Sequence, residues 1–319
     1  MAGVMTVTGE AGAGALGHVL CHEHVVASSP GIIRSWPALH GGRAALVERG
    51  VRALKAAKAA GVDTIVDCTT FDLGRDPEIL VEVSEATGVA IVAATGCWLD
   101  PSATMRARTV GQLEAWLLAD LTDGVDGTTI RAGVIKLASN ERVEPYAAMV
   151  LEAAARASNA TSTPIITHTA AAHRTGEAQA DLLESHGVDP ARVAIGHSDD
   201  SDDIGYLAGL AARGYRIAMD RIPNGALPNY GGQTVADRMD MIALLVERGW
   251  GDRVLLGHDD PIWAGLLDDE DAARHLASNP RQLAFVSEVV LPGLAERGLS
   301  DPGVRALMVE NPRRWLAGE

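Results

Sequence analysis

Residues that can bind metal ions stand at or near the ends of several apolar stretches of this sequence. Each stretch is short and rich in β-branched residues, and each carries an imidazole, an amine or a carboxylate. The residues concerned are His22, His24, Lys136, His168, His197, Asp220 and Asp259. Nitrogen and oxygen donors without cysteine suit zinc, and also cobalt, manganese or iron. We therefore expect a centre for divalent metal ions wherever the fold gathers these residues.

The spacing of His22 and His24 predicts that they lie on a strand. Side chains at i and i+2 share one face of a strand, whereas in a helix they point about 200° apart. A lone buried histidine, such as His168 or His197 taken singly, is more often a hydrogen-bonded core residue than a ligand. Two imidazoles on one buried face are costly unless something coordinates or bonds them, so the pair favours a metal site.

Lys136 is the most informative residue, because it lies inside the apolar stretch from Gly133 to Ala138. An unpaired buried ammonium is very unfavourable, and an ammonium has no lone pair for a metal. Burial near cations lowers the pKa of the amine, which can then react with carbon dioxide. The resulting carbamate is an anionic ligand able to bridge two ions. The alternative is an ammonium paired with Asp67 or Asp220.

The last of these stretches ends in two adjacent carboxylates, Asp259 and Asp260. From spacing alone either one can be the metal ligand. Asp260 can equally cap a following helix. The sequence leaves this choice open.

The elements that position these residues follow a regular alternation. Short apolar runs, typical of strands buried on both faces, alternate with amphipathic segments typical of helices. The predicted strands are Gly17–His24, Thr64–Thr69, Ala90–Gly96, Ala132–Ala138, Pro164–Thr169, Arg192–His197, Tyr215–Asp220 and Arg253–Asp259.

Helix signals lie between these strands. Asp76 precedes Pro77 as a cap residue before a proline at the first helical position, and Thr109 and Gln112 have the spacing of a capping box. Eight strand–helix repeats predict a single domain over residues 1–319, a distorted TIM (β/α)8 barrel. The carboxyl ends of barrel strands form the active site of such folds, so the metal-ligand residues should converge there.

Composition narrows the classes of partner. The chain has 319 residues, 47% of them hydrophobic, and a net charge of −15 at pH 7. An acidic surface repels nucleic acid, and no apolar stretch approaches the roughly 20 residues that span a bilayer. The stretch Met1 to Ala15 lacks the features of a signal peptide, and three scattered cysteines suit a reducing compartment. We expect a cytoplasmic protein without nucleic-acid or membrane partners.

The sequence resembles the phosphotriesterase family of the amidohydrolase superfamily nearly from end to end. The resemblance is carried by several specific motifs. They are Cys21-His22-Glu23-His24-Val25, Thr64-Ile65-Val66-Asp67, Phe71-Asp72-Leu73-Gly74-Arg75-Asp76, Val134-Ile135-Lys136, Thr167-His168-Thr169-Ala170-Ala171, Ile195-Gly196-His197-Ser198-Asp199-Asp200, His258-Asp259 and Asn311-Pro312.

The resemblance implies a role for each metal-ligand residue. His22, His24 and Asp259 would bind the more buried of two divalent ions, zinc first among the candidates. His168 and His197 would bind the more exposed ion. A carboxylated Lys136 and a hydroxide would bridge the two.

The resemblance also implies a reaction. The hydroxide would attack phosphorus or a carbonyl carbon of a small-molecule ester while the exposed ion polarises the P=O or C=O oxygen. Asp259 would accept the proton, and Asp200 would pass it outward. Family members are often homodimers, which we carry over as an expectation.

Within the family, the sequence leans toward true phosphotriesterases. The stretch from Ala94 to Pro101 resembles their leaving-group wall, with Trp98 facing an aryl leaving group and Leu99 beside it; the alternative for Trp98 is a rim residue that packs a loop. Other positions that shape the substrate pocket in relatives are occupied here by Ala27, Leu73, Ile222 and Asn224.

The sequence departs from this pattern at Arg221, where phosphotriesterases often have histidine. Arginine is always protonated and cannot relay a proton, but it can bind an anion or orient a carbonyl, and it also occurs in lactone-hydrolysing relatives. The segments Pro223–Asp237 and Asp260–Pro280 look shorter than in the best phosphotriesterases. The first expectation is therefore a phosphotriesterase, the alternative a lactonase with side activity on phosphotriesters, and the remote one a metal-bound barrel that binds without turnover.

Overall fold

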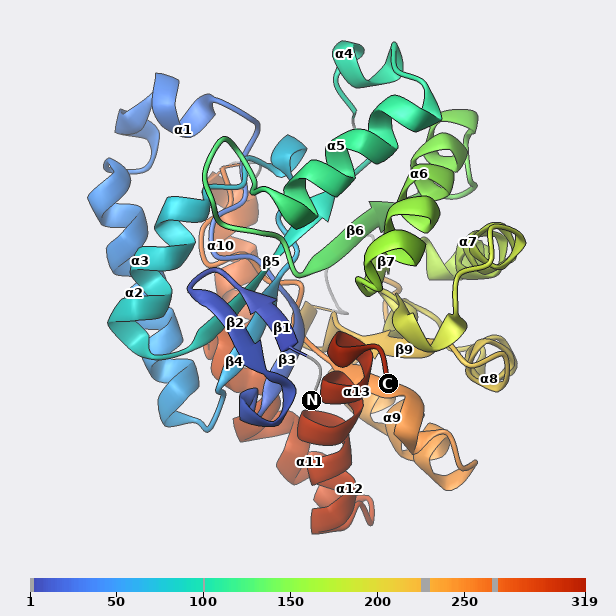
Figure 1. The fold of residues 1–319 in the computed structure, drawn as a ribbon. Helices are drawn as coiled ribbons and strands as arrows, with labels where there is room; N and C mark the ends of the chain where they lie inside the picture. Colours follow the sequence, from blue (N-terminus) through green and yellow to red (C-terminus); the bar gives the residue numbers. More distant parts are fainter. Residues whose placement is uncertain (1–2, 100, 225–229, 266–268) are drawn as a thin grey trace.

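Eight parallel strands form the centre of the molecule (Figure 1). The computed structural model describes residues 3–99, 101–224, 230–265 and 269–319. The strands follow one another around the sheet in chain order. They are β3 (Val19–Glu23), β4 (Thr64–Asp67), β5 (Ala90–Gly96), β6 (Val134–Ala138), β7 (Ile165–His168), β8 (Val193–Ile195), β9 (Arg216–Met219) and β10 (Val254–Leu256).

The first and last strands meet just beyond their regular portions. The backbone N–H of Asp259 donates to the carbonyl of His22 at 3.0 Å, and that of Ile262 donates to the carbonyl of His24 at 2.9 Å. Parallel bridges pair His24 with Pro261 and Ala27 with Ala264. The sheet is therefore a nearly closed barrel, and the predicted TIM barrel is confirmed.

Helices surround the strands on the outside (Figure 1). The longer ones are α2 (Arg43–Ala59), α3 (Pro77–Thr87), α5 (Val110–Thr122), α6 (Pro145–Thr161), α7 (Thr175–Ser185), α8 (Ile204–Ala212), α9 (Val235–Glu247) and α10 (Asp269–Ser278). Shorter ones are α1 (Ile32–Ser35), α4 (Ala103–Arg106), α11 (Leu291–Glu296), α12 (Asp301–Arg305) and α13 (Asn311–Ala317).

Two predicted helix starts are confirmed. The carboxylate of Asp76 accepts a hydrogen bond from the backbone of Ile79 at the start of α3, and Pro77 takes the first helical position. At α5, the Thr109 and Gln112 side chains each bond the other's backbone N–H, which is the capping box that the sequence indicated.

Two apolar cores lie on either side of the sheet. The larger one fills the space between strands and helices. The smaller one fills the barrel interior and takes residues from every strand: Val19, Cys21, Val66, Val92, Ala94, Val134, Ile166, Ala194, Ala218 and Leu255. Side chains fill the barrel as in other TIM barrels, so the site is formed by the residues that follow this layer along the strands.

The amino-terminal end of the barrel is covered by elements that the sequence did not predict. An antiparallel hairpin of β1 (Gly3–Thr6) and β2 (Gly9–Gly12) lies there beside α13 (Figure 1). Val4 from the hairpin and Trp315 from α13 join the interior core. Both chain ends thus contribute to the fold at the face opposite the metal-ligand residues.

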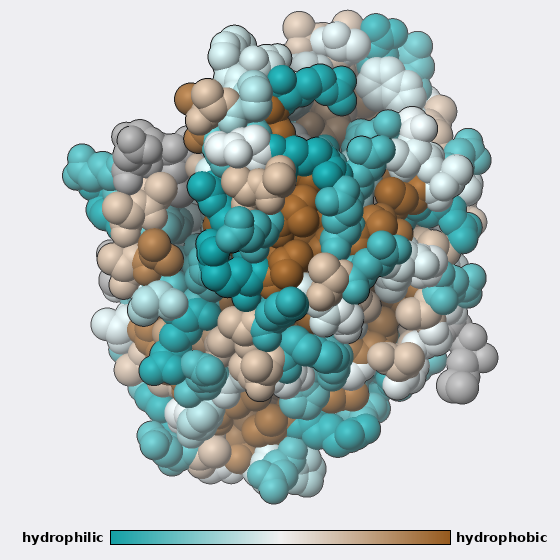
Figure 2. Space-filling model, turned by 90° about the vertical axis from the view of Figure 1, so that its left-hand side faces the viewer, coloured by the Kyte–Doolittle hydropathy of each residue, from teal (hydrophilic) through white to brown (hydrophobic). Residues whose placement is uncertain are grey.

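The face on the side of α2 and α3 carries both polar and apolar residues (Figure 2). On the side of α2 and α3, hydrophilic residues dominate, and hydrophobic ones show in a recess near the centre (Figure 2). Within the described residues, no helix combines the length and the apolar character needed to cross a bilayer.

Candidate metal centre and active site

Four of the predicted ligand residues come together where β3, β6 and β10 end. His22 Nε2 lies 3.3 Å and His24 Nε2 lies 3.1 Å from Asp259 Oδ1. Lys136 Nζ lies 2.8 Å from His22 Nε2. Imidazole nitrogens, one amine and one carboxylate oxygen from three strands therefore share one small volume.

The remaining two histidines adjoin this group. His197 Nε2 lies 2.9 Å from His168 Nδ1, and the rings of His197 and His22 stack with centroids 5.1 Å apart. His22, His197 and Asp259 each offer a ligand atom, and these three atoms lie within 4.8 Å of one another. All six predicted ligand residues thus belong to one cluster.

Local backbone irregularities turn three of these side chains inward. The register of β3 against β4 shifts between Leu20 and Glu23, and both Cys21 and its neighbour His22 reach the barrel interior. His197 and Asp259 both have left-handed backbones, with φ of 55° and 48°. Such conformations cost energy in residues other than glycine and cluster at functional sites.

Gly196 makes room for this geometry at the end of β8. A Cβ atom there would lie 1.8 Å from the carbonyl oxygen of Thr167 on the neighbouring strand. Only glycine allows the two backbones to approach this closely, and the next residue is His197.

Asp220 bonds two of the histidines; it was counted from the sequence among the residues able to bind metal, but this supporting role was not predicted. Its Oδ2 lies 2.6 Å from His22 Nδ1, and its Oδ1 lies 3.0 Å from His197 Nδ1. A carboxylate at Nδ1 fixes the proton there and leaves Nε2 free for a metal. Thr69 plays a similar part at 2.9 Å from His24 Nδ1. Asp220 ends an apolar strand, which was the available signal.

The alternative prediction, an ion pair of Lys136 with Asp67 or Asp220, is wrong among the residues that the structure describes. Asp67 accepts the backbone N–H groups of Val25 and Thr69. Asp220 is taken up by the two histidines. The buried Lys136 amine faces the imidazole of His22 instead of a carboxylate.

Burial keeps the imidazoles in the protonation state that a metal needs. It lowers the pKa of His22 to about 3, helped by the charge of Lys136. Burial and the neighbouring His197 and Arg221 lower the pKa of His168 well below its ordinary value. Burial opposes ionisation of Asp259, yet the charge of Arg221 holds the pKa of that carboxyl well below its usual range. Neutral imidazoles beside a carboxylate are the donor set of a divalent-metal site.

Arg221 lies between the two predicted proton-transfer residues. Its Nε donates to Asp259 Oδ2 at 2.7 Å, and its Nη1 donates to Asp200 Oδ2 at 2.9 Å. The guanidinium therefore joins Asp259 to Asp200 in the position where relatives often have histidine.

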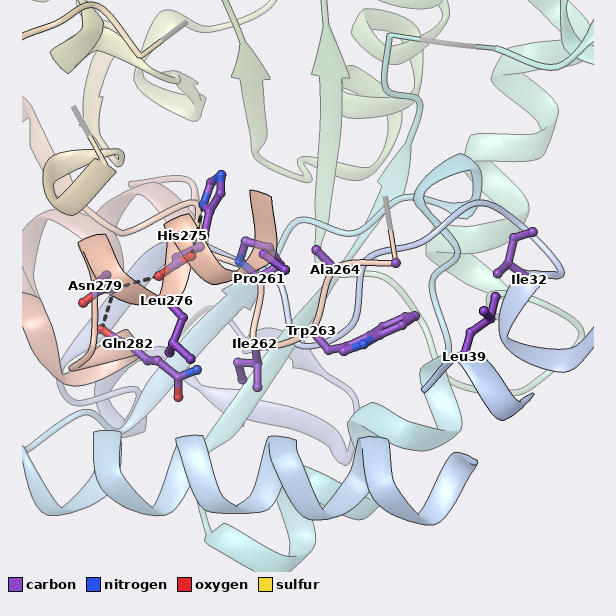
Figure 3. Close-up of a pocket in the computed structure, with 13 residues that line it drawn as sticks. Ile32, Leu39, Pro261, Ile262, Trp263, Ala264, His275, Leu276, Asn279 and Gln282 are labelled. Carbon is purple, nitrogen blue, oxygen red and sulfur yellow. Dashed lines mark hydrogen bonds and ion pairs between the residues drawn. The ribbon is translucent and has the colours of Figure 1, made fainter. Parts of the chain in front are cut away.

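Asp259 and its neighbour Asp260 have different surroundings in the structure. Asp260 Oδ2 accepts a hydrogen bond from Asn279 Nδ2 at 2.7 Å. It borders a cavity of about 330 Å³ between the segment after β10 and α10, where Trp263 and His275 also lie (Figure 3). Asp259 contacts the histidines of the metal-ligand cluster, whereas Asp260 Oδ1 lies 3.8 Å from His275 Nδ1.

Comparison with known proteins places the chain in a family. Residues 2–316 match the model of the phosphotriesterase family. The chain belongs to this family. A phosphotriesterase homology protein from Mycobacterium tuberculosis is 33% identical over 94% of this chain and 93% of its own. An aryldialkylphosphatase from Saccharolobus solfataricus is 30% identical over 95% of each chain.

A solved structure extends the likeness to three dimensions. It comes from the engineering of organophosphate hydrolysis activity from a weak promiscuous lactonase template. It aligns with a TM-score of 0.89 and 35% identity, and covers 99% of this chain and 100% of the other. As a member of the phosphotriesterase family, the chain is a metal-dependent hydrolase that acts on ester bonds.

The predicted leaving-group wall adjoins the metal-ligand cluster in this phosphotriesterase-family barrel. The Trp98 ring meets His168 edge-on, with centroids 6.3 Å apart. Leu99 is half-buried and lines a cavity of about 290 Å³ together with Trp98 and Tyr146. Asp100 lies outside the described residues. This contact favours the prediction that Trp98 faces the site over the alternative that it only packs a loop.

The other predicted pocket residues are buried in the surrounding loops. Ala27 donates its N–H to the carbonyl of Trp263, and the Leu73 carbonyl accepts from Ser28. Ile222 and Asn224 are fully buried, and the Asn224 amide oxygen accepts from Ser278 at 2.9 Å. Of the two segments predicted to be short, residues 225–229 and 266–268 lie outside the described part of the chain.

Proposed function

We propose that this chain is a binuclear-metal hydrolase that cleaves neutral esters, with phosphotriesters as the first substrate class. The observation that carries the proposal is the convergence of His22 Nε2 and His24 Nε2 on one oxygen of Asp259, at 3.3 and 3.1 Å. Histidine and carboxylate donors on one buried wall suit zinc, cobalt, manganese or iron.

In this proposal the residues would hold two ions. His22, His24 and Asp259 would hold one ion, and His168 and His197 the other. Lys136 would join them after carboxylation, which turns a donor into an anionic acceptor. The proposal is supported by Asp220, which bonds Nδ1 of His22 and of His197 and so leaves one ring nitrogen of each for a metal.

Two divalent ions, if bound there, would supply hydroxide at neutral pH and would polarise the P=O or C=O oxygen of the substrate. The protein's own groups manage the proton and the leaving group. Asp259 would accept the proton, and onward transfer to Asp200 would have to bypass Arg221, which bonds both carboxylates and cannot relay a proton. Arg221 keeps its charge throughout and holds both carboxylates in line. Trp98 provides an apolar wall for an aryl leaving group.

Lactones are the second candidate class, and Arg221 is the observation that favours them. Its guanidinium is 12% exposed and bonded to Asp259, so it can orient a carbonyl but cannot relay a proton. The structural neighbour that derives from a promiscuous lactonase template agrees with this reading. Both classes use the same metal centre and differ in the pocket.

A substrate panel on metal-reconstituted protein tests the proposal. We expect kcat/KM for aryl dialkyl phosphotriesters to exceed that for acyl-homoserine and simple γ- or δ-lactones. Lactone turnover several orders of magnitude faster would reverse the ranking. Binding of these esters without any turnover by the fully metallated protein would remove the enzyme proposal itself.

A further inference from the structure

Arg238 on α9 is a buried arginine with three partners. Its side chain is fully buried, and its Nη1 donates to Asp199 Oδ2. Its Nη2 donates to Asp200 Oδ1 at 2.8 Å and to the backbone carbonyl of Tyr230. The guanidinium therefore ties two adjacent carboxylates to one backbone turn, and none of the predicted site residues except Asp200 belongs to this group.

Each partner of Arg238 in turn contacts Arg221. Asp199 accepts the backbone N–H of Asp220 at 3.1 Å and that of Arg221 at 3.0 Å. Asp200 accepts Nη1 of Arg221 at 2.9 Å. The ring of Tyr230 lies under the Arg221 guanidinium, 4.6 Å from its Cζ to the ring centroid, which is a cation–π distance.

Three separate contacts thus fix the backbone, the charged end and the flat face of Arg221, and all three meet at Arg238. The charges of the group support the same view, because Arg238 lies against both Asp199 and Asp200. Two buried carboxylates side by side repel each other unless a cation lies between them.

We propose that Arg238 is a positioning residue that sets the place of Arg221 at the metal centre. Without it, Asp199, Asp200 and the Tyr230 ring lose their common anchor, and the Arg221 guanidinium no longer meets Asp259 in a fixed geometry. The catalytic consequence rests on the proposed function of the site, whereas the positioning itself does not.

Arg75 provides a matched control. Like Arg238, it is a buried arginine bonded to two carboxylates and one carbonyl, here Asp120, Asp126 and the backbone of Ala94. Its carbonyl partner, Ala94, belongs to β5. Removing either arginine takes one cation away from two carboxylates, so the two substitutions are alike, except that the carboxylate partners of Arg238 also contact Arg221.

Positioning can be measured without metal or activity. In ¹⁵N spectra of metal-free protein, the Nε–H resonance of Arg221 is assigned by its loss in Arg221→Ala. We expect Arg238→Lys to shift or broaden that resonance and Arg75→Lys to leave it in place. An Arg221 resonance unchanged by Arg238→Lys would overturn the proposal, whatever the enzyme hydrolyses.

A double-mutant cycle measures the catalytic consequence. We expect Arg238→Gln to lower kcat/KM about tenfold when Arg221 is present and to have little further effect in the Arg221→Ala background, because coupled residues are not additive. Arg75→Gln should change kcat/KM by the same factor in both backgrounds. An equal loss for Arg238→Gln in both backgrounds would contradict the coupling. If Arg238→Gln does not fold, Arg238→Lys serves in the same cycle.

Discussion

Asp259 and Asp260 are adjacent carboxylates with different surroundings. Asp259 lies among the histidines, whereas Asp260 bonds Asn279. We expect Asp259→Asn to lose metal and nearly all activity, and Asp260→Asn to keep its metal. Metal content per chain by elemental analysis checks this, with the two variants as controls for each other. Retention of the full metal content by Asp259→Asn would exclude it as a ligand.

Lys136 is expected to be required for the metal centre. Its amine is buried beside His22 Nε2, and as a carbamate it would supply the oxygen ligands between two ions. Lys136→Ala should lose metal and activity together, and a short carboxylic acid should partly restore both. The exposed Lys58, paired with Asp63, gives the control Lys58→Ala. A Lys136→Ala protein with two ions and the full rate would disprove the bridging role.

His258 predicts a pH dependence of stability. It bonds Glu23 through Nδ1 and accepts the backbone N–H of Val286 at Nε2, so only the neutral ring fits. Burial lowers its pKa from 6.5 to about 4. Its contribution is complete above pH 6.5 and is lost as the pH falls toward 4, because the unfolded chain takes up the proton first.

The size of this effect is about 1.4 kcal/mol per pH unit within that window. Urea unfolding of metal-free wild type and His258→Gln, repeated between pH 4 and pH 7, isolates it. The difference in free energy of unfolding should be constant above pH 6.5 and should shrink below it. A difference that stays flat down to pH 4 would show that His258 is not held neutral.

At the scale of elements, the eight strands were predictable because each is a short apolar run that ends near a polar residue. The sequence did not predict, however, that three of the ligand side chains turn toward the site. His22 depends on the register shift in β3, and His197 and Asp259 depend on left-handed backbones after β8 and β10. Alternation of side chains along a strand applies to regular backbone only, so no periodicity indicates these turns.

The end helix α13 closes the barrel at the face opposite the metal-ligand residues. Trp315 is fully buried in the interior core, and its Nε1 donates to the carbonyls of Ile165 and Arg192. Trp315→Ala should cost about 3–5 kcal/mol of stability and leave kcat unchanged at a temperature where the variant is folded.

Trp116 is the matched control for this prediction, since it is 44% exposed. Trp116→Ala should cost under about 1 kcal/mol. Thermal and urea unfolding of both variants provide the comparison. A loss of kcat in folded Trp315→Ala as large as the loss in a ligand variant would show that the two ends of the barrel are coupled.

At the scale of the molecule, the sequence indicated the barrel, its active end and all six candidate ligands, because each candidate lies within a strand or just after one. The supports of these ligands were not predictable. Asp220 is shared by two histidines from different strands, and the group of Arg238, Asp199 and Tyr230 joins α9 to the ends of β8 and β9. Such contacts depend on how distant segments meet in space.

The central claim is that two metal ions, held by the six residues, make this chain a hydrolase. Stripping the protein with chelator and adding zinc back in steps tests it, with bound metal and ester hydrolysis measured on the same samples. The account predicts that activity is absent without metal and reaches its maximum at two ions per chain. Full activity in the stripped protein, or saturation of both binding and activity at one ion per chain, would contradict it.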